Sequence, residues 1–247
     1  MDAPAPTSGA GIVRLELAGG ALHVAGSQDR RLVVGACHAS DATLLPHVTV
    51  NARGASIVQD FAPESRSAAQ IGCDLKLGTT PVHLDAHVIN MENDIVDLGG
   101  VAILTARLYN EAGHMDLDWT KPNPGVADYA ELWSIGYLSA RHLARARAKR
   151  IELKSVGFAD LDVGELNGVP IELDVVSSVG TLVLTTPAGA VARATIDQGV
   201  VVLVDAPSWK QDSPTRYLLG APDDTPQVVI RIHSASGSIR FRPEDAR

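Results

Sequence analysis

The sequence is poor in large rings and in cysteine. Aromatic residues make up 4% of the 247 residues, and only two cysteines are present. So few rings favour a core of thin, regularly stacked strands filled by Val, Leu, Ile, Ala and Gly. Cys37 and Cys73 lie 36 residues apart, without a CxxC spacing or a neighbouring ligand cluster. This spacing indicates neither a zinc site nor a disulfide framework, and we expect two buried free thiols.

A long apolar run and an excess of positive charge are also missing. No uncharged apolar run approaches the roughly 18 residues that suggest a transmembrane helix, and residues 1–10 lack the basic and apolar parts of a signal peptide. We therefore expect a cytoplasmic protein without a transmembrane segment, or an exported one if a leader is missing from the sequence as given. The formal net charge of −8 argues against nucleic acid as a partner.

Motifs of nucleophilic and nucleotide chemistry are absent as well. The sequence contains no Gly-x-Ser-x-Gly elbow and no Cys/His pair of recognisable spacing. Its glycine-rich positions precede strands rather than helices, so they do not resemble phosphate-binding loops. These absences favour a protein that is not an enzyme and that carries no cofactor.

Short alternating apolar runs, interrupted by Gly, Asn and Pro about every ten residues, fill most of the chain. This pattern predicts many short strands joined by tight corners. The predicted fold is all-β: a β-solenoid or β-helix-like stack in two related blocks, with one inserted amphipathic α-helix. We expect a disordered leader at residues 1–10, a first β block at 11–119, a loop and helix at 120–150, and a second β block at 151–247, probable parts of one continuous domain.

A corner template, Gly-x-apolar-x-apolar, recurs along the predicted strands. Glycine supplies the positive φ of a sharp corner, and the two apolar residues lie on one face of the following strand. A correspondence between residues 75–81 and 182–187, both of which end in Thr-Thr-Pro, suggests that the two blocks are related. The predicted corner residues are Gly20, Gly113, Gly180, Gly199 and Gly237.

Residues 128–150 follow a Pro/Gly-rich breaker and are predicted to form the inserted helix, with Asp128 as its N-cap. Its apolar stripe is expected to dock on the β-stack or on a second copy of the protein, which would make the helix a route to a homo-oligomer. Cations at its end would complement the helix dipole, although they also suit an acidic partner or a lipid surface. The residues concerned are Leu132, Trp133, Ile135, Tyr137, Leu138, Leu143, Arg141, Arg145 and Arg147.

Several of these motifs resemble those of the bacterial putative-adhesin family of β-solenoid-like (toastrack-like) repeat domains. The resemblance rests on NDIVDL, GHMDL, GTLVL, the two Thr-Thr-Pro segments and the closing SASGSIRFR, and it covers both blocks but not the predicted helix. It implies a repetitive β-stack without established catalytic residues. Members of this family are often exported or anchored in a membrane.

The strongest local pattern for metal chemistry is His83-x-Asp85-x-His87. Its two imidazoles and its carboxylate would project from one face of a strand. The outer faces of strands are normally polar, however, and no further His/Cys cluster is adjacent, so we expect no tightly bound metal. His114-x-Asp116-x-Asp118 has the same geometry and is the weaker candidate.

Paired carboxylates offer an alternative, because Asp160/Asp162 and Glu172/Asp174 could supply an acid and a base to a glycosidase or lyase. They alternate with apolar residues as any half-solvated strand would. The leading hypothesis is a non-enzymatic structural or interaction module that presents a repetitive β surface to a protein or glycan partner. The alternative is a carbohydrate-active β-helix enzyme that uses carboxylates from adjacent rungs.

Overall fold

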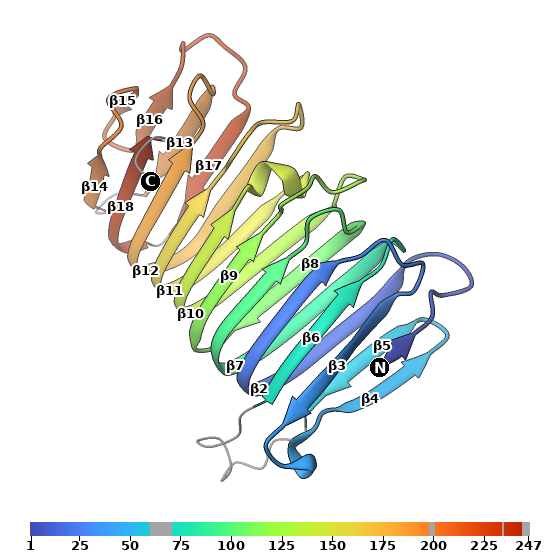
Figure 1. The fold of residues 1–247 in the computed structure, drawn as a ribbon. Helices are drawn as coiled ribbons and strands as arrows, with labels where there is room; N and C mark the ends of the chain where they lie inside the picture. Colours follow the sequence, from blue (N-terminus) through green and yellow to red (C-terminus); the bar gives the residue numbers. More distant parts are fainter. Residues whose placement is uncertain (60–70, 198–200, 234, 244–247) are drawn as a thin grey trace.

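The computed structural model describes residues 1–59, 71–197, 201–233 and 235–243. The prediction of an all-β fold is confirmed, because these residues form one sheet of 18 strands (Figure 1). The helical segments of the described ranges are the short 3-10 turns η1 (Ala42–Leu44) and η2 (Leu143–Ala146).

The strands differ in length according to whether they bend. The five long strands are β2, β7 and β12 with 16 residues each, β10 with 13 and β11 with 12. In chain order the strands are β1 (Asp2–Ala3), β2 (Gly11–Gly26), β3 (Val33–Ala39), β4 (His47–Asn51), β5 (Gly54–Val58), β6 (Ile71–Leu77), β7 (Val82–Asp97), β8 (Ile103–Asn110), β9 (Gly113–Asp118), β10 (Tyr129–Arg141), β11 (Ile151–Asp162), β12 (Ile171–Thr186), β13 (Ala192–Ile196), β14 (Val201–Val204), β15 (Trp209–Ser213), β16 (Arg216–Leu219), β17 (Val228–Ile232) and β18 (Ala235–Pro243).

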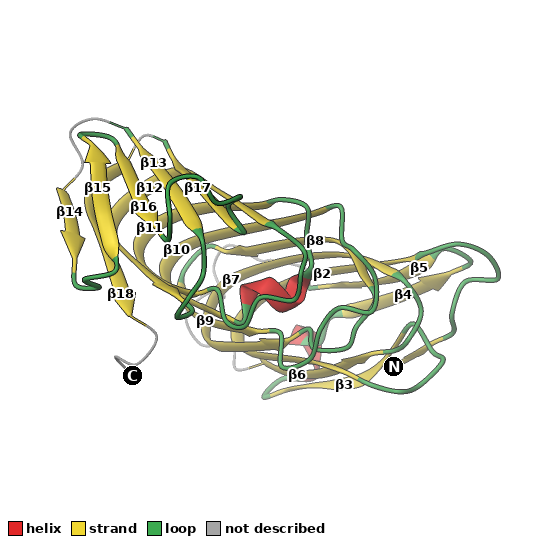
Figure 2. Cartoon of the chain, turned by 90° about the horizontal axis from the view of Figure 1, so that it is seen from above, coloured by secondary structure: helices red, strands yellow, loops and turns green. Residues whose placement is uncertain are grey.

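The long strands are stacked in parallel and each contributes to two facing layers (Figures 1 and 2). A rung, as used below, is one long strand or one pair of short strands that spans both layers. For example, β10 pairs with β8 in its first half, with β9 in its second half, and with β11 along nearly all of its length. The core of apolar side chains lies between the two layers.

The rungs follow one another in the order β5/β6, β2, β7, β8/β9, β10, β11, β12, β17/β18 and β13/β14. At one end the chain continues from β2 into the outermost rung, β5/β6, and then forms β7, which lies beside β2. At the other end it continues from β12 into the outermost rung, β13/β14, and then forms β17 and β18, which lie beside β12. Antiparallel strands lie beyond each outermost rung: β4 on β5 and β3 on β6, and β16 on β13 with β15 outside it.

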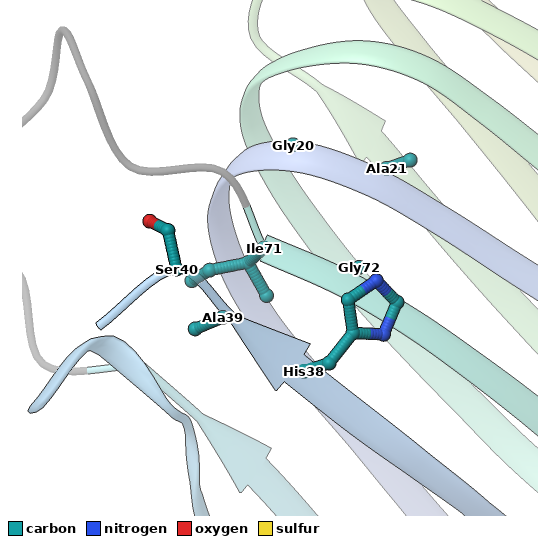
Figure 3. A pocket seen from close by; sticks show the side chains of 7 residues that line it. All are labelled: Gly20, Ala21, His38, Ala39, Ser40, Ile71 and Gly72. Carbon is teal, nitrogen blue, oxygen red and sulfur yellow. The ribbon is translucent and has the colours of Figure 1, made fainter. Parts of the chain in front are cut away.

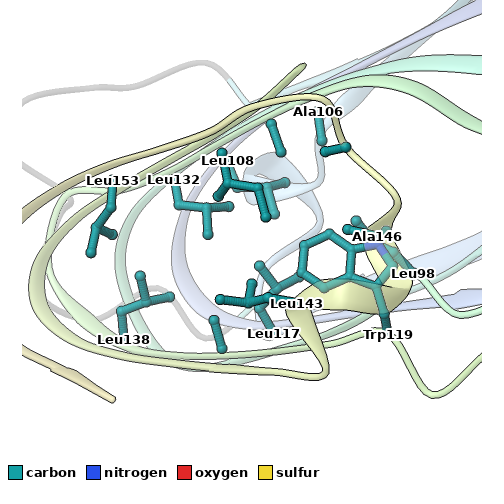
Figure 4. Packing of buried hydrophobic residues seen from close by; sticks show 14 of the residues in the cluster. Leu98, Ala106, Leu108, Leu117, Trp119, Leu132, Leu138, Leu143, Ala146 and Leu153 are labelled. Atoms are coloured by element: carbon teal, nitrogen blue, oxygen red, sulfur yellow. The ribbon is translucent and has the colours of Figure 1, made fainter. Parts of the chain in front are cut away.

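Strict alternation explains how the strands fill this core. On β8, β10 and β11 the inward residues Leu108, Leu132 and Leu153 follow one another in register and are at most 1% exposed. Leu117 and Leu138 face them from the second layer, and Trp119 and Leu143 close the loop side (Figure 4). The small inward residues allow the two layers to approach closely, so the interior needs few rings.

Glycines occupy the bends between the layers. Gly20, Gly113, Gly180 and Gly237 have φ values of +113°, +102°, +117° and +151°, whereas Gly199 lies outside the described residues. At Gly180 an added Cβ would lie 1.9 Å from the carbonyl oxygen of Gly157 on the adjacent rung. The bend therefore needs glycine both for its backbone angle and for the close approach of neighbouring rungs.

The prediction of a helix at residues 128–150 is wrong. The segment forms β10 and then η2, and the inward side chains of β10 are Ala130, Leu132, Ser134, Leu138 and Ala140 on either side of a bend at Gly136. This is the two-residue period of a strand. A helix over these residues would contain Gly136 near its middle, where glycine is unfavourable. The strand instead forms hydrogen bonds with β11 on one side and with β8 and β9 on the other. The predicted docking of this helix, and a homo-oligomer formed through it, therefore have no basis in the structure.

The prediction of free thiols is also wrong, because Cys37 and Cys73 form a disulfide. They are directly opposite each other in the antiparallel pair β3–β6.

Residues 1–10, expected to be disordered, contain β1, which pairs with β3 and buries Ala3 completely. The Pro- and Asp-rich sequence of residues 206–226 predicts an exposed loop, but the segment contains the hairpin β15–β16, whose Trp209 is 4% exposed. The sequence of residues 62–70, with Pro63, Glu64 and small polar residues, predicts a solvated connection, and this segment lies outside the described residues.

Candidate functional site: a charged and aromatic outer face

Three carboxylates are stacked on the outer surface of the first layer. Glu131 on β10 is in register with Glu152 on β11, and Glu152 is in register with Asp174 on β12. Their side chains are only 10%, 15% and 6% exposed. Adjacent strands lie about 4.8 Å apart, so three like charges in this row would repel one another strongly without cations between them.

Cations fill the spaces between these carboxylates. Lys154 Nζ lies 3.0 Å from Glu131 Oε1 and 3.0 Å from Glu152 Oε1. Arg150 Nη2 lies 3.5 Å from Glu152 Oε2, and Arg150 Nε lies 2.6 Å from Asp174 Oδ2. We call this set the charge lattice: Glu131, Glu152, Asp174, Arg150 and Lys154. Arg231 on β17 continues it by pairing with Asp174 and Glu172, and Arg107 on β8 lies 3.8 Å from Glu131.

The charge lattice determines the protonation of its members. Burial on its own would raise the pKa of Glu131, but hydrogen bonds from Lys154, Tyr109 and Tyr129 outweigh it and lower that pKa. Burial, followed by the hydrogen bond to Glu131, raises the pKa of Tyr129 to about 12. The hydrogen bonds of Lys154 with Glu152 and Glu131 raise the lysine pKa. Glu131 and Lys154 are therefore ionised at neutral pH, and Tyr109 and Tyr129 keep their protons, so neither tyrosine acts as a base there.

Aromatic side chains form two columns beside the lattice. In the first layer, Tyr109 packs edge-on against Trp133 at 5.8 Å between ring centroids, and His87 packs against Tyr109 at 6.1 Å. Past the bend, Tyr137 stacks on Phe158 at 5.0 Å with an angle of 10° between their planes. The two columns follow the stack axis across β8, β10 and β11, on either side of the glycine bends.

The distribution of rings over the molecule is uneven. Trp119, Trp209, Tyr217 and Phe241 are at most 6% exposed and belong to the core. The five other described rings are half-buried residues on the outside of three consecutive rungs, with the 39% exposed Ile135 among them. We call this surface the aromatic face; it consists of Tyr109, Tyr129, Trp133, Ile135, Tyr137 and Phe158. In a chain with so few rings, a cluster of this kind on the surface requires a reason other than core packing.

The residues predicted for metal binding lie on one outer face but have other partners. His83 Nδ1 is 2.9 Å from Thr105 Oγ1, and His87 Nε2 is 2.8 Å from Glu111 Oε1. Asp85, between them, is in register with Arg107. Within the described ranges, no group of three or more His, Cys, Asp or Glu side chains is arranged to hold a metal ion.

The second pattern, His114-x-Asp116-x-Asp118, is divided among different partners. His114 Nε2 lies 3.3 Å from Asp116 Oδ1. Asp118 instead accepts His142 Nδ1 at 2.7 Å and lies 3.9 Å from Arg141 Nε. The contact of His114 stays within β9, whereas those of Asp118 reach the next rung, so the three side chains do not share one set of partners.

The residues predicted as a helical stripe are distributed over both sides of the sheet. Leu132, Leu138 and Leu143 are core residues at 0%, 0% and 1% exposure, whereas Trp133, Ile135 and Tyr137 belong to the aromatic face. The basic run also has structural partners. Arg145 donates to the carbonyl of Thr120 and to Glu165, and Arg147 donates to the carbonyls of Asn123 and Pro124. These arginines hold loops to η2, so their explanation as dipole partners of a helix is wrong.

The carboxylate pairs proposed for glycoside chemistry each have partners in the structure. Glu172 and Asp174 both pair with Arg231. Asp160 pairs with Arg242 at 3.5 Å, and Asp162 accepts the backbone N–H of Gly164. Their role as an acid and a base stays a prediction.

A cavity near the disulfide end lies away from the aromatic face. It has a volume of about 520 Å³ and is lined by Gly20, Ala21, His38, Ala39, Ser40, Ile71 and Gly72 (Figure 3). It contains a single ionisable side chain, His38. The carboxyl of Asp94 on β7 is different, because it is 1% exposed, points into the core, and burial raises its pKa to about 7. Neither place gathers a set of catalytic groups.

Sequence reasoning missed two bends and most of the site. Gly136 and Gly157 have φ values of +135° and +125°, and each precedes a ring of the aromatic face. Both fit the Gly-x-apolar-x-apolar template, which therefore contained the signal. Tyr109, Tyr129, Phe158, Glu131 and Lys154 were not identified. The repeat Gly-His, Gly-Tyr, Gly-Phe at positions 113, 136 and 157 could have located the second column.

Two solved structures are similar to this chain. One is a putative cell adhesion protein from Clostridium sporogenes, with 12% identity, a TM-score of 0.49, and coverage of 95% of this chain and 93% of the other. The other is a putative adhesin from Bacteroides fragilis, with 12% identity, a TM-score of 0.37 and the same coverage. No protein-family model and no curated protein matches the chain.

No helix in the described part of the chain is long and apolar enough to cross a membrane.

Proposed function

We propose that the chain is a non-enzymatic, adhesin-like interaction module, in which a β-solenoid scaffold presents the aromatic face to a partner. The observation that carries the proposal is the gathering of Tyr109, Tyr129, Trp133, Tyr137 and Phe158 outside three consecutive rungs. Trp and Tyr are the residues that most often dominate binding energy, because they bury a large area with few rotatable bonds. Rungs fixed by two neighbours provide a rigid base for such a surface.

The chemistry of the outer face supports binding rather than catalysis. Glu131, Glu152 and Asp174 each contact a cation, and the pKa of Glu131 is lowered. A glycosidase needs one carboxyl with a raised pKa beside one that is ionised. The described carboxyl with a strongly raised pKa, Asp94, is sealed within the core. A substrate on the outer face could not reach it.

The disulfide supports a location outside the reducing cytoplasm. Cys37 and Cys73 bridge adjacent antiparallel strands at one end of the stack. Structural disulfides persist in oxidising compartments and on cell surfaces. We therefore propose that the module works after export, where an adhesive surface meets its partner.

The test is adhesion of the purified, fluorescently labelled protein to a panel of bacterial and epithelial cells, measured by flow cytometry. We expect the double variant Trp133→Ala/Tyr137→Ala to reduce half-maximal binding at least about tenfold, the effect of removing one or two dominant contacts. The matched control is Val201→Ala/Leu203→Ala, which removes apolar side chains that are 58% and 40% exposed on β14.

Circular dichroism and the melting temperature confirm that each variant is folded. Equal binding by the aromatic variant and the control, with both folded, would show that the aromatic face is not the adhesive surface. Loss of binding in the control alone would move the site to the end of the stack.

A further inference from the structure

The aromatic face and the charge lattice form one continuous surface. Tyr109 on β8 and Tyr129 on β10 both hydrogen-bond to Glu131, which also contacts Lys154 on β11. Trp133 lies two residues after Glu131 on the same side of β10. A ligand that covers the rings of the first layer therefore also touches the lattice. The chemistry of this ligand must therefore suit both the aromatic face and the charge lattice.

A protein partner suits this combination poorly. The centre of a protein interface is depleted of charged residues. Removing a charge from water costs free energy, and only new partners of excellent geometry offset this cost. The ions of the lattice already satisfy one another, so a protein covering them would lose their remaining hydration and gain little. A ligand rich in hydroxyl groups avoids this cost, since each hydroxyl both donates and accepts and can replace the water on Glu131 or Lys154.

The rings require apolar surface from the same ligand. Tyr109 and Trp133 are half-buried, so each retains an outer part that water wets poorly. A sugar ring has apolar C–H groups over its faces and hydroxyls around its rim, which matches rings next to a lattice of ions. Flat, amphipathic units of this type satisfy both halves of the surface together.

The arrangement along the stack also determines the shape and charge of the ligand. The first column, His87, Tyr109 and Trp133, follows the stack axis over β7, β8 and β10, at about 4.8 Å per strand. The cavity described above lies elsewhere, so this open row favours an extended chain over a single enclosed sugar. Lys154 and Arg150 each lie between two carboxylates and leave no unmatched cation for an acidic sugar. The surface is therefore matched to a neutral chain.

We propose that the aromatic face binds a neutral, linear oligosaccharide that runs along the stack axis, an inference that rests on the proposed function. Tyr109 and Trp133, which follow each other along the stack axis in the first layer, contact the sugar rings, and the charge lattice hydrogen-bonds their hydroxyls. Lys154 and Glu131 are binding residues in this arrangement, and no bond of the sugar is broken.

Isothermal titration calorimetry with cellohexaose, chitohexaose and mannohexaose tests the inference, with hexagalacturonate as the acidic chain. We expect at least one neutral chain to bind, Tyr109→Ala and Trp133→Ala to weaken it about tenfold each, and Lys154→Met to weaken it more modestly. Val201→Ala, at the far end of the stack, should leave the affinity unchanged. Release of reducing ends should stay at the background rate.

The outcomes separate this inference from the proposed function. If no neutral chain binds while cell adhesion still depends on Trp133 and Tyr137, the ligand is not a neutral sugar and the adhesive face stands. If hexagalacturonate alone binds, the assignment of a neutral ligand is overturned. Sugar binding that persists in both ring variants places the sugar elsewhere. Absence of both sugar binding and cell adhesion overturns the inference and the proposed function together.

Discussion

The middle of the stack and its two ends are built by different rules. Between β7 and β12 every rung has a parallel neighbour on each side, and the rings on the strands β8, β10 and β11 point outward. At the ends the parallel order stops. The first end has antiparallel strands and the Cys37–Cys73 disulfide, and the second has antiparallel strands and a cluster in which Trp209 and Tyr217 pack on Phe241.

This difference shows where a stack of this kind is vulnerable. A middle rung is held by neighbours on both sides, so it needs no additional fastening and can use its outer residues for binding. An outermost rung has one neighbour and an open core, and it must be covered and fastened. A covalent bond performs that task at one end, and buried rings perform it at the other.

The largest effect is expected from disrupting a middle bend. Gly180→Val would force a branched side chain into a backbone with φ of +117° and place its Cβ 1.9 Å from the carbonyl oxygen of Gly157. We expect a loss of more than about 3 kcal/mol in the free energy of unfolding, because strain and a displaced strand add together. Urea denaturation followed by circular dichroism measures it.

The matched control is Gly125→Val, at a glycine that has open space around it. This change should alter the free energy of unfolding by no more than about 0.5 kcal/mol. Equal midpoints for the two variants would contradict the role of the bends in holding the middle of the stack.

Removing the disulfide should have an intermediate effect that is confined to one end. The double variant Cys37→Ala/Cys73→Ala releases a bridge between residues 36 apart and is expected to cost about 2–4 kcal/mol. Hydrogen exchange should accelerate in β3 and β6 while β10 and β11 remain protected. Equal acceleration in all four strands would show that the end and the middle are one cooperative unit, against the comparison above.

The smallest effect, and one that depends on pH, is expected from Asp94 where the first end joins the middle. Its pKa is raised from 3.8 to about 7 in the folded protein. Between these values the unfolded chain has lost the proton and the folded chain retains it, so stability falls as pH rises. The expected slope is roughly 1 kcal/mol per pH unit between pH 5 and 7.

Asp94→Asn is the control for this dependence, because an amide of the same size does not titrate. Its melting temperature should change less between pH 5 and 7 than that of the original protein. An identical pH profile for the two proteins would show that Asp94 is not the group responsible.

Local pattern was sufficient for the strands and for several bends, because burial between two layers imposes alternation and a positive φ demands glycine. It failed at residues 128–150 because of the aromatic face. Trp133, Ile135 and Tyr137 occupy outward positions that are polar in an ordinary strand, so the alternation was hidden and the segment looked like an apolar helical stripe.

Other features depend on distant pairing and could not be predicted from local pattern. Cys37 meets Cys73 only because β3 turns back along β6. The charge lattice requires Glu131, Glu152 and Asp174 to fall in register, although a bulge after Leu153 shifts the pairing of β11 with β12 within the same rungs. A spacing counted along the sequence does not reveal such shifts.

The outward-and-return path of the chain at each end has a consequence for how such molecules change in length. Both outermost rungs are built by excursions, and the rungs between β7 and β12 join only their nearest neighbours. Duplication of one middle segment would thus lengthen the stack by about 4.8 Å and leave both ends intact. If the duplicated segment carried a ring and a lattice ion, the new copy would add one more binding subsite, so reach and avidity could grow in steps of a single rung.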